Sequence, residues 1–223
     1  MIDNYNKSDE GEYSVENEPL KNGNYVIQTN NTIQQSLSVN EEAKLAPLAT
    51  KWTFWLDSQK NKFSSKEDYE AGLEIISTVE TVQEFWSVFN NIPAPNRLAN
   101  RVSYHLMRQN RKPLWEDREN ENGGIYTYRC SRTKTNTAWQ ELCLAAIGEQ
   151  FSVIDGDDIV GISIQSREAQ LDIIQIWNTN PSEEAQKAID KTILQLFPDN
   201  IFPVKFYKAN SSHVNFEVKN NQQ

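Results

Sequence analysis

The sequence contains few residues of the kinds that hold metals or form disulfides. Among its 223 residues there are 2 cysteines, Cys130 and Cys143, and 2 histidines, His105 and His213. So few thiols and imidazoles argue against a zinc cluster, a histidine-based catalytic triad and the disulfide framework of a secreted domain. We therefore expect reduced, buried cysteines, no metal and no cofactor, in a protein of the cytoplasm or the nucleus.

Long apolar runs and a surplus of basic residues are also missing. No stretch approaches the roughly 20 consecutive apolar residues that cross a bilayer, and no basic start leads into an apolar run. The sequence therefore indicates neither a membrane protein nor a secreted one. Its 22 Lys and Arg residues stand against 31 Asp and Glu residues, a net charge of -9. This balance argues against a broad basic surface for long nucleic acids.

Catalytic motifs are missing as well, since there is no glycine-rich phosphate loop, no CxxC pair and no HExxH. The paired acids Asp157 and Asp158 are expected to cap or solvate a strand, because nothing places a nucleophile beside them. His105 is expected to be an ordinary strand residue. We predict that the protein has no catalytic residues and is not an enzyme.

The composition divides the chain into one domain and two tails. Residues 1–45 are acidic, rich in Asn and Ser, and almost free of apolar periodicity, so we expect a disordered acidic tail. Residues 209–223 are polar in the same way and are expected to form a C-terminal tail. The segment 46–208 is long enough for one domain with its own hydrophobic core.

Strand and helix patterns are interspersed through this segment. Strands are expected at residues 51–57, 101–108, 125–130, 157–167, 171–178 and 202–208. Helices are expected to begin at the capping-box spacings of Thr81 with Glu84 and of Thr137 with Gln140, and at Asn180-Pro181. The connections between strands are too short for regular crossover helices. This predicts an α+β fold, an antiparallel sheet with helices on one face.

A tryptophan and an acid, Trp115 and Glu116, stand side by side in the polar stretch 111–124. One interpretation is a loop-anchoring ring beside a solvated charge, because tryptophan is commonly buried. The other is a base-stacking platform: the indole supplies a π face, and the carboxylate accepts two N–H bonds from a guanine edge. A positively charged base would be favoured by both groups. The residues alone leave both interpretations open.

Two apolar pairs lie off the main stripes of their expected helices. Val82 and Trp86 form the first pair, and Leu144 and Ile147 form the second. Each pair either widens the core face of its helix or belongs to an exposed patch for a partner helix.

Seven stretches carry a joint pattern: "KWTFWLD", "TVQEFWSVFNNIP", "SYHLMR", "KPLWEDRENENGG", "TAWQELCLAAIGEQF", "GISIQSR" and "IIQIWN". The pattern resembles the eukaryotic translation initiation factor 4E family, most of all its class III members, over residues 47–208. The resemblance implies a curved antiparallel sheet backed by three helices on its convex face. It also implies binding of the 7-methylguanosine 5′ cap of messenger RNA, in translation initiation or its regulation.

The resemblance also implies roles for single residues of a cap site. Trp115 is a stacking ring, Glu116 bonds the guanine edge, Trp177 lies against the N7-methyl group and Arg167 is on the phosphate side. The second stacking ring falls at Tyr69, where the class III pattern has cysteine, with Phe63 as the alternative. A ring at Tyr69 would make the protein bind like the family classes that have two rings.

The phosphate side departs from the family pattern. Ile125 occupies the position of a basic residue, and a family lysine falls at Asp172 or Ile173. Losing these contacts should weaken binding. The basic residues that could compensate are Arg129, Arg132 and Lys134.

A second surface carries over from the family, one that binds a helical peptide of the scaffold factor 4G or of 4E-binding repressors. Its residues here are Pro47, Leu48, Val82, Trp86, Leu144, Ile147 and Gly148. Ala46 replaces a histidine there, and Gln140 replaces a leucine. An alternative function is therefore a protein-interaction module that sequesters such peptides and binds caps weakly. A sequence-tolerant binder of single-stranded RNA is a third idea, which the acidic balance disfavours.

Overall fold

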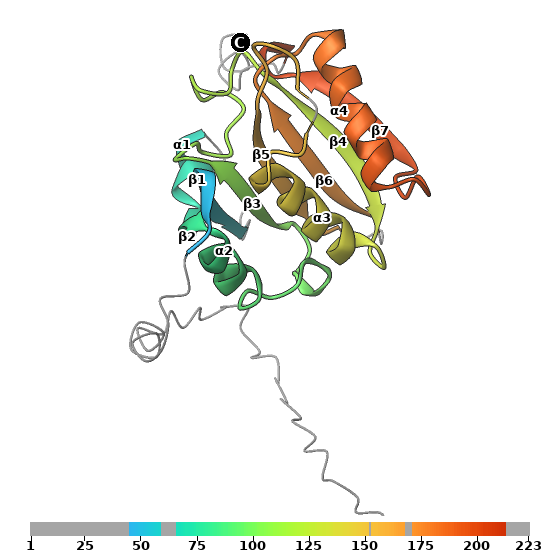
Figure 1. Cartoon of the computed structure of the whole chain (residues 1–223). Helices are drawn as coiled ribbons and strands as arrows, with labels where there is room; N and C mark the ends of the chain where they lie inside the picture. Colours follow the sequence, from blue (N-terminus) through green and yellow to red (C-terminus); the bar gives the residue numbers. More distant parts are fainter. Residues whose placement is uncertain (1–44, 59–65, 152, 168–170, 213–223) are drawn as a thin grey trace, which may run out of the picture. The chain divides into compact units, whose positions relative to one another are not determined.

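One antiparallel sheet organises this computed structural model, which describes residues 45–58, 66–151, 153–167 and 171–212 (Figure 1). Its strands are β1 (Pro47–Ser58), β2 (Leu73–Thr81), β3 (Val102–Arg108), β4 (Gly124–Ser131), β5 (Ile159–Gln165), β6 (Leu171–Asn178) and β7 (Val204–Ala209). They lie in the order β2-β1-β3-β5-β6-β4-β7, and every pairing is antiparallel. The expected α+β class and curved antiparallel sheet are confirmed.

The helices are α1 (Lys66–Ala71), α2 (Val82–Phe89), α3 (Thr135–Ile147) and α4 (Glu183–Leu196), with short 3-10 turns at Pro95–Arg97 and Asn210–Ser212. Side chains of α2, α3 and α4 form the main hydrophobic cluster with one face of the sheet, which we call the helix-covered face (Figure 1). We call the opposite side the open face. No helix of the described residues is long and apolar enough to span a membrane.

Strand alternation assigns side chains to the two faces. On β1, Trp52, Phe54 and Leu56 belong to the helix-side cluster, whereas Trp55 belongs to a second cluster on the open face. Both cysteines are buried and free, as expected. Almost all of the expected N-terminal tail, and most of the C-terminal one, lies outside the described residues; Asn210, near the end of the described part, is buried and its side chain donates to Asn120 O at 2.7 Å.

The helix starts agree with the sequence in one case out of three. Thr81 caps α2, and Glu84 completes the capping box, as predicted. The box at Thr137 was wrong, because α3 already begins at Thr135, whose hydroxyl donates to Asp172 Oδ2 at 2.7 Å. The cap at Asn180 was also wrong, since Ser182 accepts from the first turn of α4.

Two elements were not predicted, α1 and β2. β2 is an edge strand in which Val79 is the one fully buried residue, so its sequence shows no clear alternation. α1 is a 6-residue helix in the polar connection that follows β1. α1 carries Tyr69, the residue expected to be the second stacking ring.

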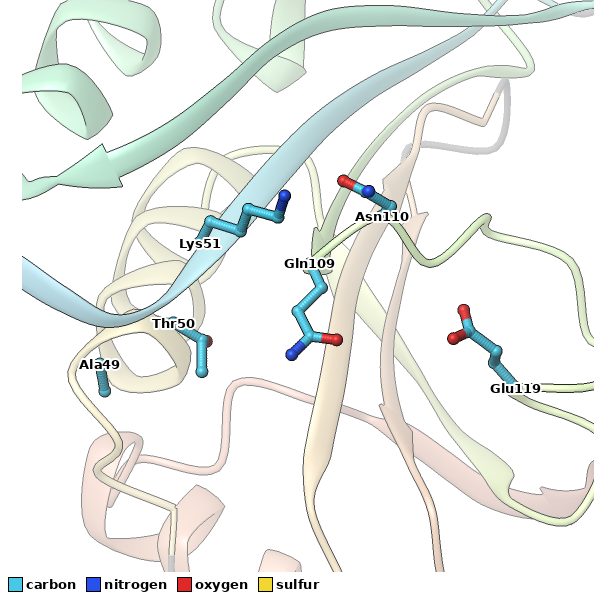
Figure 2. A pocket seen from close by; sticks show the side chains of 6 residues that line it. All are labelled: Ala49, Thr50, Lys51, Gln109, Asn110 and Glu119. Carbon is cyan, nitrogen blue, oxygen red and sulfur yellow. The ribbon is translucent and has the colours of Figure 1, made fainter.

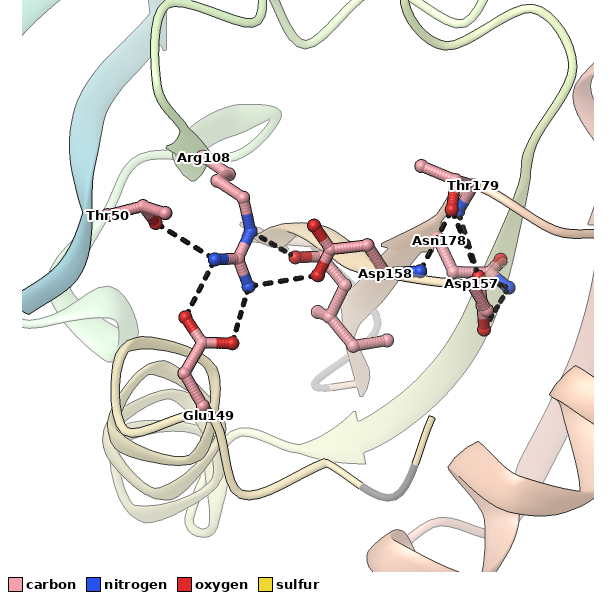
Figure 3. Close-up of polar contacts among 8 residues, drawn as sticks. Thr50, Arg108, Glu149, Asp157, Asp158, Asn178 and Thr179 are labelled. Carbon is pink, nitrogen blue, oxygen red and sulfur yellow. Dashed lines mark hydrogen bonds and ion pairs between the residues drawn. The ribbon is translucent and has the colours of Figure 1, made fainter. Parts of the chain in front are cut away.

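Arg108, at the end of β3, joins three elements (Figure 3). Its guanidinium donates to Thr50 Oγ1 at 2.8 Å and to both carboxylate oxygens of Glu149 at 2.7 and 2.9 Å, and it lies 4.6 Å from the Trp52 ring centroid. A further contact reaches Asp158 Oδ1 at 3.1 Å. The start of β1 is therefore fixed against the residues that follow α3.

Asp157 organises the turn after β6 (Figure 3). Its Oδ1 accepts from the backbone N–H groups of Thr179 and Asn180 at 3.1 and 2.9 Å. Together with the Arg108 contact of Asp158, this confirms that the paired acids have structural roles.

Candidate functional site

The open face carries a small aromatic cluster. Its buried members are Trp55, Met107, Ile125, Val160 and Trp177, and Leu73 and Trp115 pack against it. Gly161 is central to the packing, because it pairs with Met107 on one side and with Trp177 on the other. A Cβ atom at position 161 would lie 2.4 Å from Met107 Sδ and 3.4 Å from Trp177 Cδ1. Glycine therefore lets both side chains lie close against the sheet.

Trp177 is held in place by hydrogen bonding beneath the cluster. Its indole N–H donates to Ser163 Oγ at 2.9 Å, and the same oxygen lies 2.7 Å from His105 Nδ1. Burial lowers the pKa of His105 to about 3, so the imidazole is neutral at physiological pH. His105 is thus an ordinary strand residue of β3, as expected, with a positioning contact to the site. Only 4% of Trp177 is exposed.

The loop between β3 and β4 carries Trp115 and Glu116. It is anchored by Leu114, which is buried, and by Asn120, whose side-chain amide donates to Lys112 O and Leu114 O, each at 2.8 Å. Asn210 in turn donates to the carbonyl of Asn120. The loop is therefore well ordered, and Trp115 rests half-buried on the aromatic cluster.

Glu116 is also half-buried, and its Oε2 atom is buried without a hydrogen-bond partner among the described residues. An unsatisfied buried acceptor costs about 1–3 kcal/mol, more when it is charged. Native proteins rarely tolerate such a group unless a ligand or water completes it. An acceptor beside a half-exposed indole is the pair that a planar ligand with N–H donors requires.

Tyr69 approaches the same place from α1. Its hydroxyl donates to Asp57 Oδ2 at 3.1 Å. Burial raises the pKa of Tyr69 above its usual range, and the carboxylates of Asp57 and Glu116 raise it further. The phenol is therefore protonated, and it lies within reach of the charge of Glu116, the residue after Trp115. Phe63 lies outside the described residues.

An ion pair links the two segments that carry the rings. Lys112, three residues before Trp115, pairs with Glu70, the residue after Tyr69. Both side chains are more than a third exposed, so the pair contributes little stability, on the order of 0–1 kcal/mol. Its effect is to connect α1 to the loop.

A group of guanidiniums lies at another part of the open face. Arg167 follows β5, and burial, together with the nearby charges of Arg129 and Arg101, lowers its pKa. Among the described residues, no carboxylate side chain forms an ion pair with these three arginines. The backbone N–H of Arg101 donates to Ser166 O at 2.9 Å, which fixes it beside Arg167. Three like charges held together favour an anion.

The other basic candidates have different surroundings. Arg132 donates to Ser166 Oγ, to Arg167 O and to Asp172 Oδ1, so it is engaged in the fold. Lys134 is the exposed N-cap residue of α3. Of the possible substitutes, Arg129 is the one beside Arg167, and Arg101 is a further one that no sequence motif indicated.

The residues expected at the partner surface lie on β1, α2 and α3 or directly beside them, and hydrogen bonds connect these elements. The backbone N–H of Val82 donates to Ala46 O at 2.9 Å, and Arg108 ties Thr50 to Glu149. Val82 is 36% exposed, whereas Ile147 is only 6% exposed and belongs to the core. The remaining expected members are half-buried or exposed: Pro47, Leu48, Trp86, Leu144 and Gly148.

An open hollow of about 540 Å³ lies between β1, the end of β3 and the loop that carries Trp115 (Figure 2). It is lined by Ala49, Thr50, Lys51, Gln109, Asn110 and Glu119. None of these side chains is aromatic, and the two charges have opposite signs. The hollow therefore suits neither a stacked base nor a polyphosphate, and the aromatic cluster remains the better candidate site.

Known proteins match this chain over most of its length. A family profile described as eukaryotic initiation factor 4E matches residues 47–223. Eukaryotic translation initiation factor 4E-1 of Citrullus lanatus is 37% identical over 183 residues, which cover 82% of this chain and 76% of that protein. The corresponding protein of Phaseolus vulgaris is 40% identical over 146 residues, which cover 65% of this chain and 62% of that protein.

Solved structures are similar as well. A complex of C. elegans eIF4E-3 with the 4E-binding protein Mextli and cap analog has a TM-score of 0.64 and 28% identity, covering 74% of this chain and 92% of that chain. Ascaris suum eIF4E-3 with m2,2,7G cap has a TM-score of 0.65 and 26% identity, covering 76% and 94%. These names do not test the class III likeness, which stays a prediction.

Proposed function

The chain belongs to the eukaryotic initiation factor 4E family, and we propose on that premise that it binds the 7-methylguanosine 5′ cap of messenger RNA in translation initiation or its regulation. The observation that carries the proposal is the half-buried Trp115 beside a carboxylate oxygen of Glu116 that lacks a partner among the described residues. The function is binding and not catalysis. We expect the protein to act in the cytoplasm, where translation is initiated.

The base is held by stacking and by one acid. Trp115 supplies one π face, and Tyr69 closes the site from α1. Glu116 accepts the two adjacent N–H donors of the guanine edge, which completes its buried Oε2 atom. A methylated guanine carries positive charge, so ring quadrupoles and carboxylate all favour it over a neutral purine.

From the base at Trp115 and Glu116, the N7-methyl group and the phosphates of the cap extend along the sheet. In this proposal Trp177, of which 4% is exposed, meets the N7-methyl group. Ile173 lies four residues earlier on β6 and pairs with Arg129, which places the arginine roughly 13 Å along the strand. The phosphate chain runs in that direction to Arg167, Arg129 and Arg101.

A second function of the same chain is the binding of a 4E-binding peptide. The supporting observation is the group of partly exposed apolar side chains Leu48, Val82, Trp86 and Leu144, which lie on three elements held together by hydrogen bonds. A solved complex of a structural relative contains the 4E-binding protein Mextli. An amphipathic helix of scaffold factor 4G or a repressor fits such a surface.

One experiment with reciprocal variants tests both assignments. Trp115→Ala should lower the affinity for 7-methyl-GTP about 5- to 150-fold, the equivalent of about 1–3 kcal/mol for one stacked base, in a fluorescence titration. Trp115→Phe should recover part of it, because a π face returns. Trp86→Ala should leave this affinity unchanged and weaken a 4E-binding peptide.

Each variant is therefore the control for the other: Trp86→Ala for the binding of 7-methyl-GTP, and Trp115→Ala for the binding of the peptide. Unchanged binding of 7-methyl-GTP by Trp115→Ala would defeat the site. Equal loss of peptide binding in both variants would indicate a folding defect instead of a partner surface, and unfolding curves of each variant decide that point.

A further inference from the structure

A buried acid of the open face is absent from the roles described so far. Asp57 is 1% exposed, near the end of β1. It follows Trp55 by two residues and so lies on the same face of the strand. Burying a carboxylate is costly unless hydrogen bonds or charges compensate it. Its hydrogen bond from the Tyr69 hydroxyl, at 3.1 Å, ties it to the base site.

The surroundings of Asp57 narrow its possible roles. Its partners in the strand pairings are Ser103 on β3 and Leu73 on β2, which are both uncharged residues. Within the described residues there is no group of His, Cys, Asp and Glu that could hold a metal ion. The second acid in this area is Glu116, whose carboxylate lies near the same phenol. Asp57 therefore bonds the Tyr69 hydroxyl, and the charge of Glu116, the chain neighbour of Trp115, reaches the same hydroxyl.

We propose that Asp57 is a positioning and specificity-determining residue of the base site, which fixes the Tyr69 ring and adds a second negative charge that favours a cationic purine. The proposal rests on the cap-binding function and deepens it. The hydrogen bond orients the ring that closes the site, so its loss affects every base equally. The charge acts at short range in a partly desolvated place, so its loss affects the methylated base most.

Two single variants separate these contributions. Asp57→Asn removes the charge but keeps a side-chain oxygen that can accept from Tyr69. Tyr69→Phe removes the hydrogen bond but keeps both the ring and the charge of Asp57. The probes are 7-methyl-GTP and GTP, and the readout is the ratio of their affinities, which a merely structural role would not change.

A matched control exists on the helix-covered face. Tyr126 donates to Asp190 Oδ2 at 3.1 Å, a tyrosine–aspartate bond of the same length far from the base site in sequence and on the other side of the sheet. Asp190→Asn should leave both affinities unchanged. Should Asp57→Asn not fold, Asp57→Ser tests the same loss of charge with a smaller side chain.

We expect Asp57→Asn to lower the affinity for 7-methyl-GTP on the order of tenfold, as for one charge-assisted contact, and the affinity for GTP much less. Tyr69→Phe should lower both affinities by a similar factor. An unchanged ratio in Asp57→Asn overturns the proposal. If the wild-type protein binds 7-methyl-GTP in a Trp115-dependent manner and the ratio is unchanged, this inference alone fails; if the wild type does not bind at all, the proposed function fails with it.

Discussion

The two faces of the sheet bury their residues for different purposes. On the helix-covered face, apolar side chains of α2, α3 and α4 close over Trp52, Phe54 and Leu106, which are fully buried. On the open face, the same strands bury polar groups such as Asp57, Ser103 and His105. On the helix-covered face, burial of apolar surface stabilises the fold. On the open face, polar atoms remain that a ligand can hydrogen-bond.

This difference suggests how residues that stabilise the fold can be distinguished from residues that bind a ligand. We expect tryptophans of the helix-covered face to contribute to stability and Trp115, on the open face, to contribute mainly to binding. Trp139 is a residue of α3 and is almost fully buried in the main hydrophobic cluster, whereas Trp115 is half-buried on a loop. The predictions below test whether the faces are as distinct in solution, from the largest expected effect to the smallest.

Truncating a side chain of the helix-covered face should have the largest effect. Phe54→Ala removes a fully buried ring and should lower the free energy of unfolding by about 3–5 kcal/mol in denaturant titrations. Trp115→Ala is the comparison on the open face and should lower it far less. An equal loss in both variants would make Trp115 a core residue and would erase the distinction.

The neutral histidine of the open face should make stability depend on pH. The pKa of His105 is about 3 in the folded protein, against about 6.5 in an unfolded chain. Its contribution is therefore fully present above pH 6.5, and it is lost as the pH falls, because the unfolded state takes up a proton first. The expected slope approaches about 1.4 kcal/mol per pH unit below pH 6.5.

Unfolding free energies measured at pH 7.5, 6.0 and 5.0 check this expectation. The His105→Asn variant should lose the slope between pH 6.5 and 5, a range above the ordinary pKa of most carboxyl groups. The same slope in the variant would mean that another group titrates.

The arginine group should give the smallest effect, one limited to ligands with phosphates. Arg167→Ala should weaken 7-methyl-GTP on the order of fivefold, a value reduced because the side chain is partly exposed to solvent. Binding of the nucleoside 7-methylguanosine should not change. Arg118→Ala, an exposed arginine on the loop after Trp115, is the matched control. Equal weakening of nucleoside and nucleotide would move Arg167 out of the phosphate side.

The fold was predictable where periodicity is strong. The strand at 171–178 was predicted with its observed bounds, because it is a run rich in β-branched and aromatic residues, in which six of the eight residues are buried. β2 was not predicted, because an edge strand with one buried residue shows little alternation of apolar and polar residues. The start of α3 was misplaced because Thr135 is fixed by Asp172, a contact between residues far apart in the sequence.

The site was predictable only in part, because its residues belong to a family pattern but its geometry does not. Trp115, Glu116 and Tyr69 were named from the sequence; Trp115 and Glu116 share one loop, and the charge of Glu116 reaches the Tyr69 phenol. Asp57 was not named, since a buried acid and a solvated one look the same in a sequence. Arg101 was also missed. It lies beside Arg167 only because β3 and β5, which are far apart in the sequence, pair in the sheet.

The hydrogen bond between Trp177 and Ser163 has a consequence for what the cluster can sense. The indole N–H already donates to Ser163 Oγ, so an approaching molecule can contact only carbon atoms of the ring. The ring can make favourable contacts with a hydrophobic substituent, but it has no free N–H to donate to a polar atom of the ligand. In the proposed cap site, discrimination by Trp177 would rest on shape and polarisability, and recognition of donor groups would rest on Glu116.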